Sequence, residues 1–441
     1  MPKAAVVTLG CKLNQVDSEA IIESFMRAGY EIVPFTEPAD VYVVNSCTVT
    51  GKTDHQTRQL LRRAIRRKES SPGTIVVATG CYAQTAPRGL VEMVDGLDLV
   101  VGNLDKERIP ELIADIATAP EIIVRDVFSE RDFRTVPIDN FSKLTRAFLR
   151  VQEGCNHRCA YCIVPFGRGY ERSAPLQTAI QQARRFAENG YREVVITGIH
   201  IGRYGKGLDP ESSLAELIKE IHRIDGIKRI RLSSIDPKEF SGDLFDALNT
   251  IRDKLCPHFH ISLQSGDDSI LKSMRRDYTI EEYSAVVEKL RSLFPDVCIG
   301  NDLIVGFPGE TDENFQATLE FLRKSRPAYF HVFRYSPRTG TAAADFPDQV
   351  HEDVKRARSM KLHELRTELS VEFRTGFLNR ELEVMLESRR CKKTGMLTGL
   401  SGNYIRIDAQ GPDEWMDRIV KAVPVSLTRN GMLAGRIEVV E

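Results

Sequence analysis

Three closely spaced cysteines are the strongest chemical signal in the sequence. Cys155, Cys159 and Cys162 form a CxxxCxxC run that reads CNHRCAYC. Three thiolates on one short loop suit a [4Fe–4S] cluster, whose irons are bound by cysteine sulfur. Four cysteines would saturate the four irons, so three leave one iron open for another ligand. Zinc sites more often use paired CxxC or CxxH elements, so zinc is the weaker alternative, and we expect His157 to face solvent.

Three further cysteines lie far apart in the first hundred residues. Cys11, Cys47 and Cys81 each follow a short apolar segment, in the contexts LGC, NSC and TGC. If these segments are parallel strands, their carboxyl ends share one sheet edge and bring the cysteines together. A second metal or cluster site is one interpretation, and three buried core cysteines are the other. Three isolated cysteines are expected to be small core residues: Cys256, Cys298 and Cys391.

Composition and charge limit the classes of protein that fit. The chain has 441 residues, of which 42% are hydrophobic and 28% charged, which excludes a disordered or fibrous protein. A net charge of −1 gives no global attraction to nucleic acid, so any such contact must use local basic patches. No apolar stretch approaches the roughly 18 residues of a membrane span, and no leader pattern precedes the first strand. We therefore expect a cytoplasmic protein without a membrane partner, in which reduced thiols form no disulfide framework.

Residues 1–135 are predicted to form an open parallel α/β sheet domain. Short β-rich runs at Ala4–Leu9, Val41–Val44 and Thr74–Ala78 alternate with helical patterns at Asp17–Ala28 and Asp54–Lys68. Strand–helix–strand alternation of this kind is typical of a parallel sheet. A polar, turn-rich segment from 126 to 142 is expected to be a linker.

Residues 142–375 are predicted to form a partial (βα)6 barrel that resembles an incomplete TIM barrel. Six β-like segments alternate with helical patterns, and a charged helix follows from about Val350 to Thr375. Six units instead of eight predict an open side, large enough for a macromolecular substrate. The six expected strands are Arg146–Gln152, Glu193–Thr197, Arg229–Ser233, His258–Leu263, Val297–Ile304 and Tyr329–Phe333.

Polar residues and a glycine close several of these strands. Gly198 follows the second strand, Gln264 and Ser265 follow the fourth, and Asn301 and Asp302 lie in the fifth. Since sites on such barrels form at the carboxyl ends of the strands, we interpret these residues as cofactor-binding. Ordinary turn chemistry is the alternative for each of them taken singly.

Residues 376–441 are predicted to form a small antiparallel β-barrel. Hydrophobic residues alternate at period two, with glycines and an Asn-Gly turn at 430–431 between the runs. Basic residues crowd a turn of this domain and one helix of the first domain. Such local patches can neutralise RNA phosphates, although solvated faces explain them equally well. The predicted RNA-binding residues are Arg58, Arg62, Arg63, Arg389, Arg390, Lys392 and Lys393.

The CxxxCxxC run after the first strand of a six-unit βα barrel resembles the radical S-adenosylmethionine superfamily. The resemblance implies that the open iron chelates the amino and carboxylate groups of S-adenosylmethionine. It also implies that an electron from the cluster cleaves a carbon–sulfur bond to give a 5′-deoxyadenosyl radical. An external electron donor is an implied partner. The protein would then hold the cofactor and the target atom together and exclude water.

The whole chain resembles the methylthiotransferases of that superfamily. This resemblance assigns Cys11, Cys47 and Cys81 to a second, auxiliary [4Fe–4S] cluster. The last domain, with Gly399–Tyr404 (GLSGNY) near its centre, resembles the TRAM RNA-binding module. The implied enzyme has two clusters, uses S-adenosylmethionine and acts on tRNA.

Four N-terminal motifs separate the methylthiotransferase subfamilies. The chain reads GCKLNQ from Gly10, CTVT from Cys47, QTRQLLRR from Gln56 and GCYAQ from Gly80. These motifs are similar to enzymes that insert a methylthio group at C2 of N6-threonylcarbamoyladenosine, at position 37 beside the tRNA anticodon. Isopentenyladenosine enzymes usually read GCQMN and GCMAQ, and ribosomal-protein aspartate enzymes usually read GCPKN. Ala174 departs from the family, which usually has arginine there. Those two substrates, and a non-catalytic iron–sulfur RNA-binding protein, are the alternatives.

Overall fold

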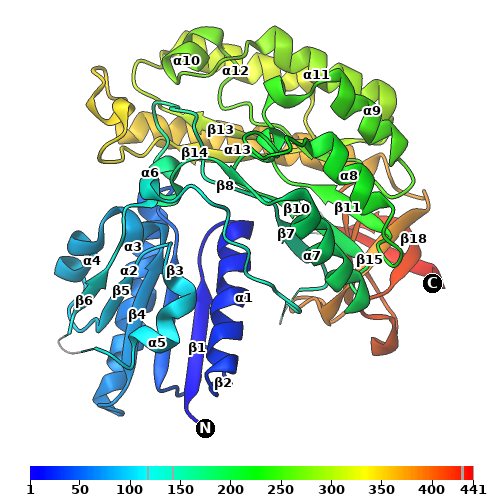
Figure 1. Cartoon of the computed structure of the whole chain (residues 1–441). Coiled ribbons are helices and arrows are strands. Elements are labelled where there is room, and N and C mark those ends of the chain that lie inside the picture. Colours follow the sequence, from blue (N-terminus) through cyan, green and yellow to red (C-terminus); the bar gives the residue numbers. More distant parts are fainter. Residues whose placement is uncertain (117–118, 142–143, 429–431, 441) are drawn as a thin grey trace.

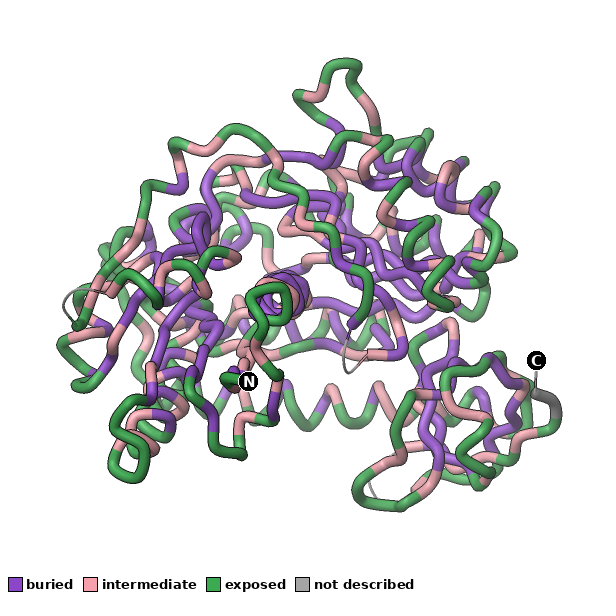
Figure 2. Tube along the Cα trace, turned by 60° about the horizontal axis from the view of Figure 1, so that its bottom comes forward, coloured by how far each residue is buried: buried purple, intermediate pink, exposed green. Residues whose placement is uncertain are grey.

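A computed structural model describes the chain except for residues 117–118, 142–143, 429–431 and 441. An N-terminal α/β domain and a C-terminal barrel flank a central domain, and they stand apart from each other in both views (Figures 1 and 2). Buried residues follow the strands of the N-terminal and central domains in Figure 2. Among the described residues, no helix is both long and apolar enough to cross a lipid bilayer. The boundaries 1–135, 142–375 and 376–441 stay predictions.

The N-terminal domain is a six-stranded parallel sheet with the order β2-β1-β3-β4-β5-β6. The three expected strands are present, and three further strands of two or three residues each are too short to leave a sequence pattern. Apolar residues of α1 and α2 pack on opposite faces of the sheet. The strands are β1 (Lys3–Thr8), β2 (Glu31–Ile32), β3 (Val41–Ser46), β4 (Ile75–Gly80), β5 (Leu99–Val101) and β6 (Glu121–Ile123), and the helices are α1 (Lys12–Arg27), α2 (Gly51–Ile65), α3 (Cys81–Thr85), α4 (Pro87–Met93) and α5 (Ile109–Leu112).

The central domain holds the six expected parallel strands, in two three-stranded sheets with the orders β11-β10-β7 and β12-β13-β14. Parallel bridges from Ile230 to Leu255 and from Ile235 to Ile261 join the two sheets into one open barrel. The strands are β7 (Ala147–Arg150), β10 (Glu193–Thr197), β11 (Arg229–Leu232), β12 (His258–His260), β13 (Cys298–Val305) and β14 (Tyr329–Arg334). A short hairpin of β8 (Gln152–Glu153) and β9 (Arg172–Ser173) follows β7, and the helices are α6 (Val164–Arg168), α7 (Leu176–Glu188), α8 (Leu214–His222), α9 (Gly242–Thr250), α10 (Asp268–Ser273), α11 (Ile280–Leu293) and α12 (Asp312–Ser325).

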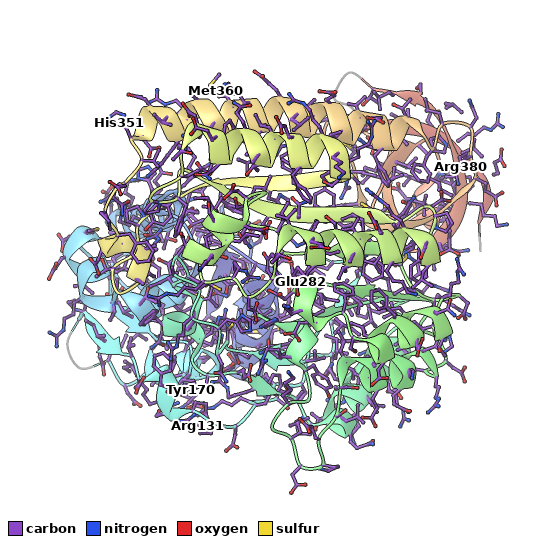
Figure 3. The ribbon with its side chains drawn as sticks, turned by 90° about the horizontal axis from the view of Figure 1, so that it is seen from above. Arg131, Tyr170, Glu282, His351, Met360 and Arg380 are labelled. Carbon is purple, nitrogen blue, oxygen red and sulfur yellow. The ribbon has the colours of Figure 1, made fainter. Side chains whose placement is uncertain are left out.

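Two segments connect the domains. The expected linker is irregular apart from a 3-10 turn at Val127–Ser129, and its last residue, 142, lies outside the described residues. It packs on the central domain through Arg131, whose guanidinium lies 4.2 Å from the ring centroid of Tyr170 (Figure 3). The long helix α13 (Glu352–Thr375) begins after His351 and exposes Met360 on its outer side (Figure 3). It leads directly to the C-terminal barrel.

The C-terminal domain is a closed five-stranded barrel with the order β15-β16-β17-β19-β18. Four of its pairings are antiparallel as expected, but β17 and β19 pair in parallel. The last strand closes the barrel by crossing to β17, a long-range pairing that period-two alternation cannot reveal. The expected Asn-Gly turn at 430–431 lies outside the described residues. The strands are β15 (Leu382–Arg390), β16 (Leu397–Ser401), β17 (Arg406–Ala409), β18 (Ile419–Leu427) and β19 (Leu433–Val440).

Buried arginines attach this barrel to the central domain. Arg229 donates to the carbonyl of Leu400, and Arg231 donates to the carbonyls of residues 401 and 402. Both arginines also pair with Glu193, which is fully buried. Burial opposes ionisation of Glu193, but the two guanidinium groups lower its pKa to about 2. The C-terminal barrel is therefore an integral part of the fold rather than a loosely tethered module.

Candidate active site

The three N-terminal cysteines meet at one edge of the parallel sheet. Strands β1, β3 and β4 are neighbours and end in register, and Cys11, Cys47 and Cys81 follow their carboxyl ends. Two glycines make this approach possible. Gly10 and Gly80 have φ of +102° and +91°, and a Cβ on Gly10 would lie 2.6 Å from the Cβ of Cys47. Such backbone conformations and contacts exclude larger residues before these cysteines.

Asn14, in the first turn of α1, holds two of the cysteine loops together. Its side-chain amide donates to the carbonyls of Leu9 and Ser46, over 2.7 and 2.9 Å, just before Cys11 and Cys47 respectively. Arg168 of the central domain donates to the Asn14 Oδ1. The loops of the N-terminal cysteines are thus held by Asn14, which is itself bonded to Arg168, a residue that follows the second cysteine run.

Burial and the neighbouring thiols raise the pKa of the buried N-terminal cysteine, as expected when three thiols lie close together. Cys47 is buried, and desolvation together with the Cys81 and Cys11 thiols raises its pKa to about 11. Thiols that raise one another's pKa lie close together, since two thiolates would repel. A cationic cluster core would compensate such thiolates, whereas an apolar core would not require them to converge.

The second cysteine group lies on the loop between the β8–β9 hairpin strands. The loop is fixed by the Ala160 amide, which donates to the carbonyl of Met274, and by the Cys162 amide, which donates to the carbonyl of Cys159. Arg276 places Nη1 at 3.1 Å from the Cys159 sulfur. Desolvation and the Cys159 thiol raise the pKa of Cys162 to about 12. The three thiols therefore form a second compact group beside a cation.

The donor atoms of the two cysteine groups bear on the choice between a cluster and a single metal ion. Among the described residues, no three of the six motif cysteines have sulfur atoms that all lie within 4.8 Å of one another. Four ligands of one zinc ion would be that close, because zinc–sulfur bonds are about 2.3 Å long. Ligands on separate irons of a cube stand further apart. The all-thiolate donor sets fit [4Fe–4S] clusters, whose irons are bound by cysteine sulfur.

Helix α6 joins the two cysteine groups. It begins two residues after Cys162, and a Cβ on its Gly167 would lie 3.6 Å from the Cys81 sulfur. The Gly167 carbonyl accepts a 2.6 Å hydrogen bond from Asn103, whose amide is also 3.9 Å from the Cys81 sulfur. The residues that close the second cysteine loop therefore pack directly on the first group.

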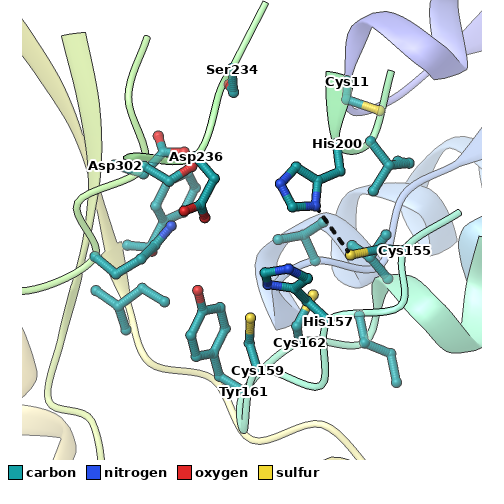
Figure 4. A pocket seen from close by; sticks show the side chains of 18 of the residues that line it. Cys11, Cys155, His157, Cys159, Tyr161, Cys162, His200, Ser234, Asp236 and Asp302 are labelled. Carbon is teal, nitrogen blue, oxygen red and sulfur yellow. Dashed lines mark hydrogen bonds between the residues drawn. The ribbon is translucent and has the colours of Figure 1, made fainter. Parts of the chain in front are cut away.

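A cavity of about 420 Å³ opens at the carboxyl ends of the barrel strands and against the N-terminal domain. Cys11 reaches it from the N-terminal domain, and Cys155, Cys159 and Cys162 reach it from the barrel. Figure 4 shows Asp302 on the side of the cavity opposite Cys155. One space is thus shared by sulfurs of both groups, at the position where barrels of this kind bind ligands.

The structure brings three of the five predicted cofactor-binding residues into this cavity. Gly198, Gln264 and Asp302 line it, whereas Ser265 and Asn301 are not among the described residues that do so. Asn301 precedes Asp302 in β13, and successive strand residues point to opposite faces. Its amide therefore donates to the Tyr283 hydroxyl in the surrounding helical layer. The buried Ser265 instead accepts from the amide of residue 267.

Several cavity residues were not predicted from the sequence. Asp236 pairs with Arg276, which contacts Cys159, and the Cys155 sulfur lies 4.0 Å from Nδ1 of His200 (Figure 4). The expectation for His157 is wrong. It lines the cavity and its ring lies edge-on to His200 at 4.7 Å, because the cysteine loop folds inward rather than over the surface. The isolated cysteines 256 and 298 are buried as expected, but Cys391 is only partly buried.

Comparison with known proteins identifies the family. Residues 149–322 match the Radical SAM superfamily, and residues 3–102 match the uncharacterized protein family UPF0004. Over 426 residues the chain is 39% identical to the threonylcarbamoyladenosine tRNA methylthiotransferase MtaB of Bacillus subtilis, covering 96% of this chain and 93% of that protein. The chain belongs to the radical SAM methylthiotransferase family.

A second relative and a solved structure refine this assignment. Identity falls to 33% over 435 residues with the tRNA-2-methylthio-N(6)-dimethylallyladenosine synthase of Syntrophotalea carbinolica, over 98% of each chain. The methylthiotransferase is therefore MtaB-like, as its N-terminal motifs predict. The radical S-adenosylmethionine methyltransferase TsrM of Kitasatospora setae shares the fold, with a TM-score of 0.56 and 14% identity over 78% of this chain and 75% of that chain.

The cofactors of this methylthiotransferase are S-adenosylmethionine and two [4Fe–4S] clusters. Two compact thiol groups are present for two clusters, their donor atoms are all sulfurs, and the shared cavity offers a place for S-adenosylmethionine. Ala174, where the family usually has arginine, is 2% exposed and packs in the apolar core of the central domain. A substrate contact at that position is therefore excluded for this methylthiotransferase.

Some of the predicted RNA-binding residues are exposed, and others form hydrogen bonds or ion pairs within the protein. Arg58 donates to the Tyr82 hydroxyl, and Arg390 pairs with Asp413 while donating to two backbone carbonyls. These two arginines stabilise the fold locally. The exposed members are Arg62, Arg63, Arg389, Lys392 and Lys393, although Arg62 also donates to the carbonyl of residue 93.

Proposed function

We propose that this methylthiotransferase inserts a methylthio group at C2 of N6-threonylcarbamoyladenosine, at position 37 beside the anticodon of tRNA. One observation carries the proposal: Cys11 shares a single cavity with Cys155, Cys159 and Cys162. A sulfur-inserting enzyme needs a radical source and a sulfur-bearing site on either side of the same target atom. The relatives named MtaB, at 35–40% identity, support this nucleoside as the substrate.

We assign each cysteine group to one cluster. Cys155, Cys159 and Cys162 would hold the cluster that binds S-adenosylmethionine, and Cys11, Cys47 and Cys81 would hold the auxiliary cluster. When bound, the clusters and S-adenosylmethionine supply the radical, the sulfur and the methyl group. An external donor would supply the electrons.

The cavity residues would orient S-adenosylmethionine and the target base. Gly198 leaves room for close backbone approach, since a Cβ there would lie 2.9 Å from Gln152. Gln264, with φ of +67°, and Asp302 present polar groups from neighbouring strands. The largely apolar remainder of the lining would exclude water from the reacting atoms.

RNA would be held by the exposed basic residues of α2 and of the β15–β16 turn. Arg62, Arg63, Arg389, Lys392 and Lys393 can each pair with a phosphate, which a net charge of −1 does not prevent. The target base would be splayed out into the open barrel, as single-stranded RNA loops allow. Since the proposed substrate is tRNA, the protein would act in the cytoplasm.

Anaerobic assays with defined tRNAs test the proposal. The reduced enzyme with S-adenosylmethionine should add one methylthio group to tRNA that carries threonylcarbamoyladenosine, detected by nucleoside mass spectrometry. Reaction with isopentenyladenosine tRNA or with a ribosomal protein instead would overturn the substrate. Failure of a fully clustered preparation to form 5′-deoxyadenosine would contradict our assignment of the barrel cysteines.

A further inference from the structure

Lys12 is a cation that lines the cavity and has no ion-pair or hydrogen-bond partner among the described residues. It follows Cys11 as the first residue of α1, and its side chain lines the cavity. Within the described part of the chain, no carboxylate lies within 4.0 Å of its ammonium and no acceptor receives a hydrogen bond from it. The nearby arginines differ, because Arg231 pairs with Glu193 and Arg146 lies 3.6 Å from Glu387. This partly buried ammonium therefore has no paired carboxylate in the part of the chain that the structure describes.

The surroundings of Lys12 are electropositive. The guanidinium groups of Arg231 and Arg146 both act on the Lys12 ammonium as like charges. Burial, Arg231 and Lys12 together lower the pKa of His258 well below its usual value. The first turn of α1, a helix of 16 residues, adds the positive end of its dipole. Cys11 and Asp302 are the opposite charges among the described groups that act most strongly on Lys12, and neither forms an ion pair with it, so its ammonium can pair with an anionic ligand.

An aromatic stack stands beside this cation. The His258 ring is parallel to Tyr404 of the C-terminal barrel at 4.1 Å, and to Tyr329 of β14, two strands away in the sheet, at 5.8 Å. Tyr404 is 40% exposed and has φ of +67°, a left-handed conformation. His260 connects the stack to the cavity, since its Nε2 is buried, donates no hydrogen bond and lies 3.3 Å from Asp302. Flat rings with an accessible end suit a nucleobase.

A cation beside a ring stack fits one chemical class of ligand. The ligand is an adenine whose N6 substituent ends in an anion. The threonylcarbamoyl group ends in a carboxylate, whereas a dimethylallyl group is uncharged and apolar. S-adenosylmethionine also has a carboxylate, but the open iron of the radical cluster is expected to bind it.

We propose that Lys12 is the specificity-determining residue of the substrate pocket and pairs with the carboxylate of the threonylcarbamoyl group. This inference rests on the proposed function. Pairing would bring a charged substrate group to the edge of the auxiliary site, next to Cys11. It would thereby place the adenine ring between the two cysteine groups, with the Tyr404–His258 stack available to the base.

Binding of anticodon stem–loop RNAs to the full-length, cluster-loaded enzyme tests this inference. The variants are K12Q, K12R and the control K289Q, which removes the same charge from the exposed face of α11. We expect K12Q to lose about ten- to a hundredfold in affinity for RNA with threonylcarbamoyladenosine, the size of one charge-assisted hydrogen bond. Affinity for RNA with unmodified adenosine should stay unchanged. K12R should recover most of the loss, and K289Q should behave as the wild type.

Lys12 adjoins Cys11, so K12Q could also change the iron content. A modified RNA tests the same contact in the wild-type enzyme. Methyl esterification of the threonyl carboxylate removes its charge and leaves the rest of the RNA intact. The wild type should bind the ester about ten- to a hundredfold more weakly than the acid. In K12Q with normal iron content the acid and the ester should bind equally, which closes a double-mutant cycle.

Three results would overturn the inference. Equal losses on modified and unmodified RNA would assign Lys12 to a phosphate. Unchanged preference for the acid over the ester in K12Q would remove Lys12 from recognition, and equal wild-type binding of acid and ester would exclude any carboxylate contact. A wild type that binds and discriminates these RNAs but forms no methylthio product would instead contradict the proposed function, so the two failures are distinguishable.

Discussion

The two cysteine groups are assembled in different ways, although the barrel group and Cys11 of the N-terminal group line the same cavity. Cys155, Cys159 and Cys162 come from one eight-residue segment, whose loop is held by a few local hydrogen bonds. Cys11, Cys47 and Cys81 span 71 residues and meet only because three neighbouring parallel strands end in register. The first group is a property of a loop, and the second is a property of a folded domain. We therefore expect mutations remote from the cysteines to damage the second group first.

Loss of the local group should have the largest effect. The triple variant C155A/C159A/C162A should lower the iron content from about eight to about four per chain, because each cube holds four irons. It should form neither 5′-deoxyadenosine nor product, since the radical source is lost. Iron analysis and chromatography of the nucleoside products check this. Residual 5′-deoxyadenosine would show that the radical cluster lies elsewhere.

Loss of the N-terminal cysteine group should separate 5′-deoxyadenosine formation from methylthio transfer. The variant C11A/C47A/C81A should also retain about four irons but should still form 5′-deoxyadenosine, because the barrel cysteines are unchanged. Methylthio transfer to tRNA should be abolished, because the variant lacks the site that we propose to carry the sulfur. The measurement is the ratio of 5′-deoxyadenosine to methylthiolated nucleoside. A variant that still transfers a methylthio group would refute the assignment of this site.

A substitution at Arg168 tests, without a change to any cysteine, whether the N-terminal cysteine group depends on remote residues more than the barrel group does. This residue is 1% exposed, pairs with Asp17 and Glu153, and donates to Asn14. R168A leaves two buried carboxylates short of a cation and should lower the free energy of unfolding by about 3–5 kcal/mol. It should also deplete the auxiliary site, because Asn14 holds the loops of Cys11 and Cys47, while 5′-deoxyadenosine formation persists.

Urea unfolding and iron analysis measure the two consequences. The exposed R185A on α7 serves as control and should change stability by less than about 1 kcal/mol. Equal loss of both clusters in R168A would show that the barrel loop depends on this arginine as strongly as the sheet edge does.

The same ion pairs predict an acid-sensitive domain junction. Burial opposes ionisation of Asp17 and Glu153, but Arg168 and Arg150 lower the pKa of both carboxyls below their ordinary values of 3.8 and 4.5. A carboxyl whose folded pKa is lowered stabilises the protein above its unfolded pKa, and this stabilisation is lost as the pH falls through the folded pKa. Stability should therefore fall below about pH 4.5. E153Q should unfold with a weaker pH dependence, measured in urea between pH 3 and 7, whereas a parallel curve would contradict this account.

The smallest effect is expected from the exposed basic residues. Reversing Arg389, Lys392 and Lys393 should weaken tRNA binding severalfold and reduce its salt dependence by about one unit for each phosphate that is no longer neutralised. R62E/R63E tests the α2 patch in the same way. Deleting the C-terminal barrel would be a poorer test, because Arg229 and Arg231 would be deprived of their carbonyl partners. Unchanged affinity in both variants would place RNA recognition on another surface.

The sequence by itself determined the features that depend on short-range order. Spacing identified both cysteine groups, and β-rich runs placed the six barrel strands and β1, β3 and β4 close to their observed bounds. These patterns are readable because strand periodicity and a metal-binding loop are properties of consecutive residues. The glycines before Cys11 and Cys81 are part of the same signal, since the backbone conformation before each cysteine requires them.

Only the tertiary structure decided which side chains meet across the fold. It turned Asp302 into the cavity and Asn301 away from it, and it engaged Arg58 and Arg390 in local bonds. It also joined Asn14 to Arg168 across 154 residues and, within the described part of the chain, left Lys12 without a partner beside the cavity. The physical reason is that side-chain pairing depends on strand order, face and domain packing, and none of these is a property of neighbouring residues.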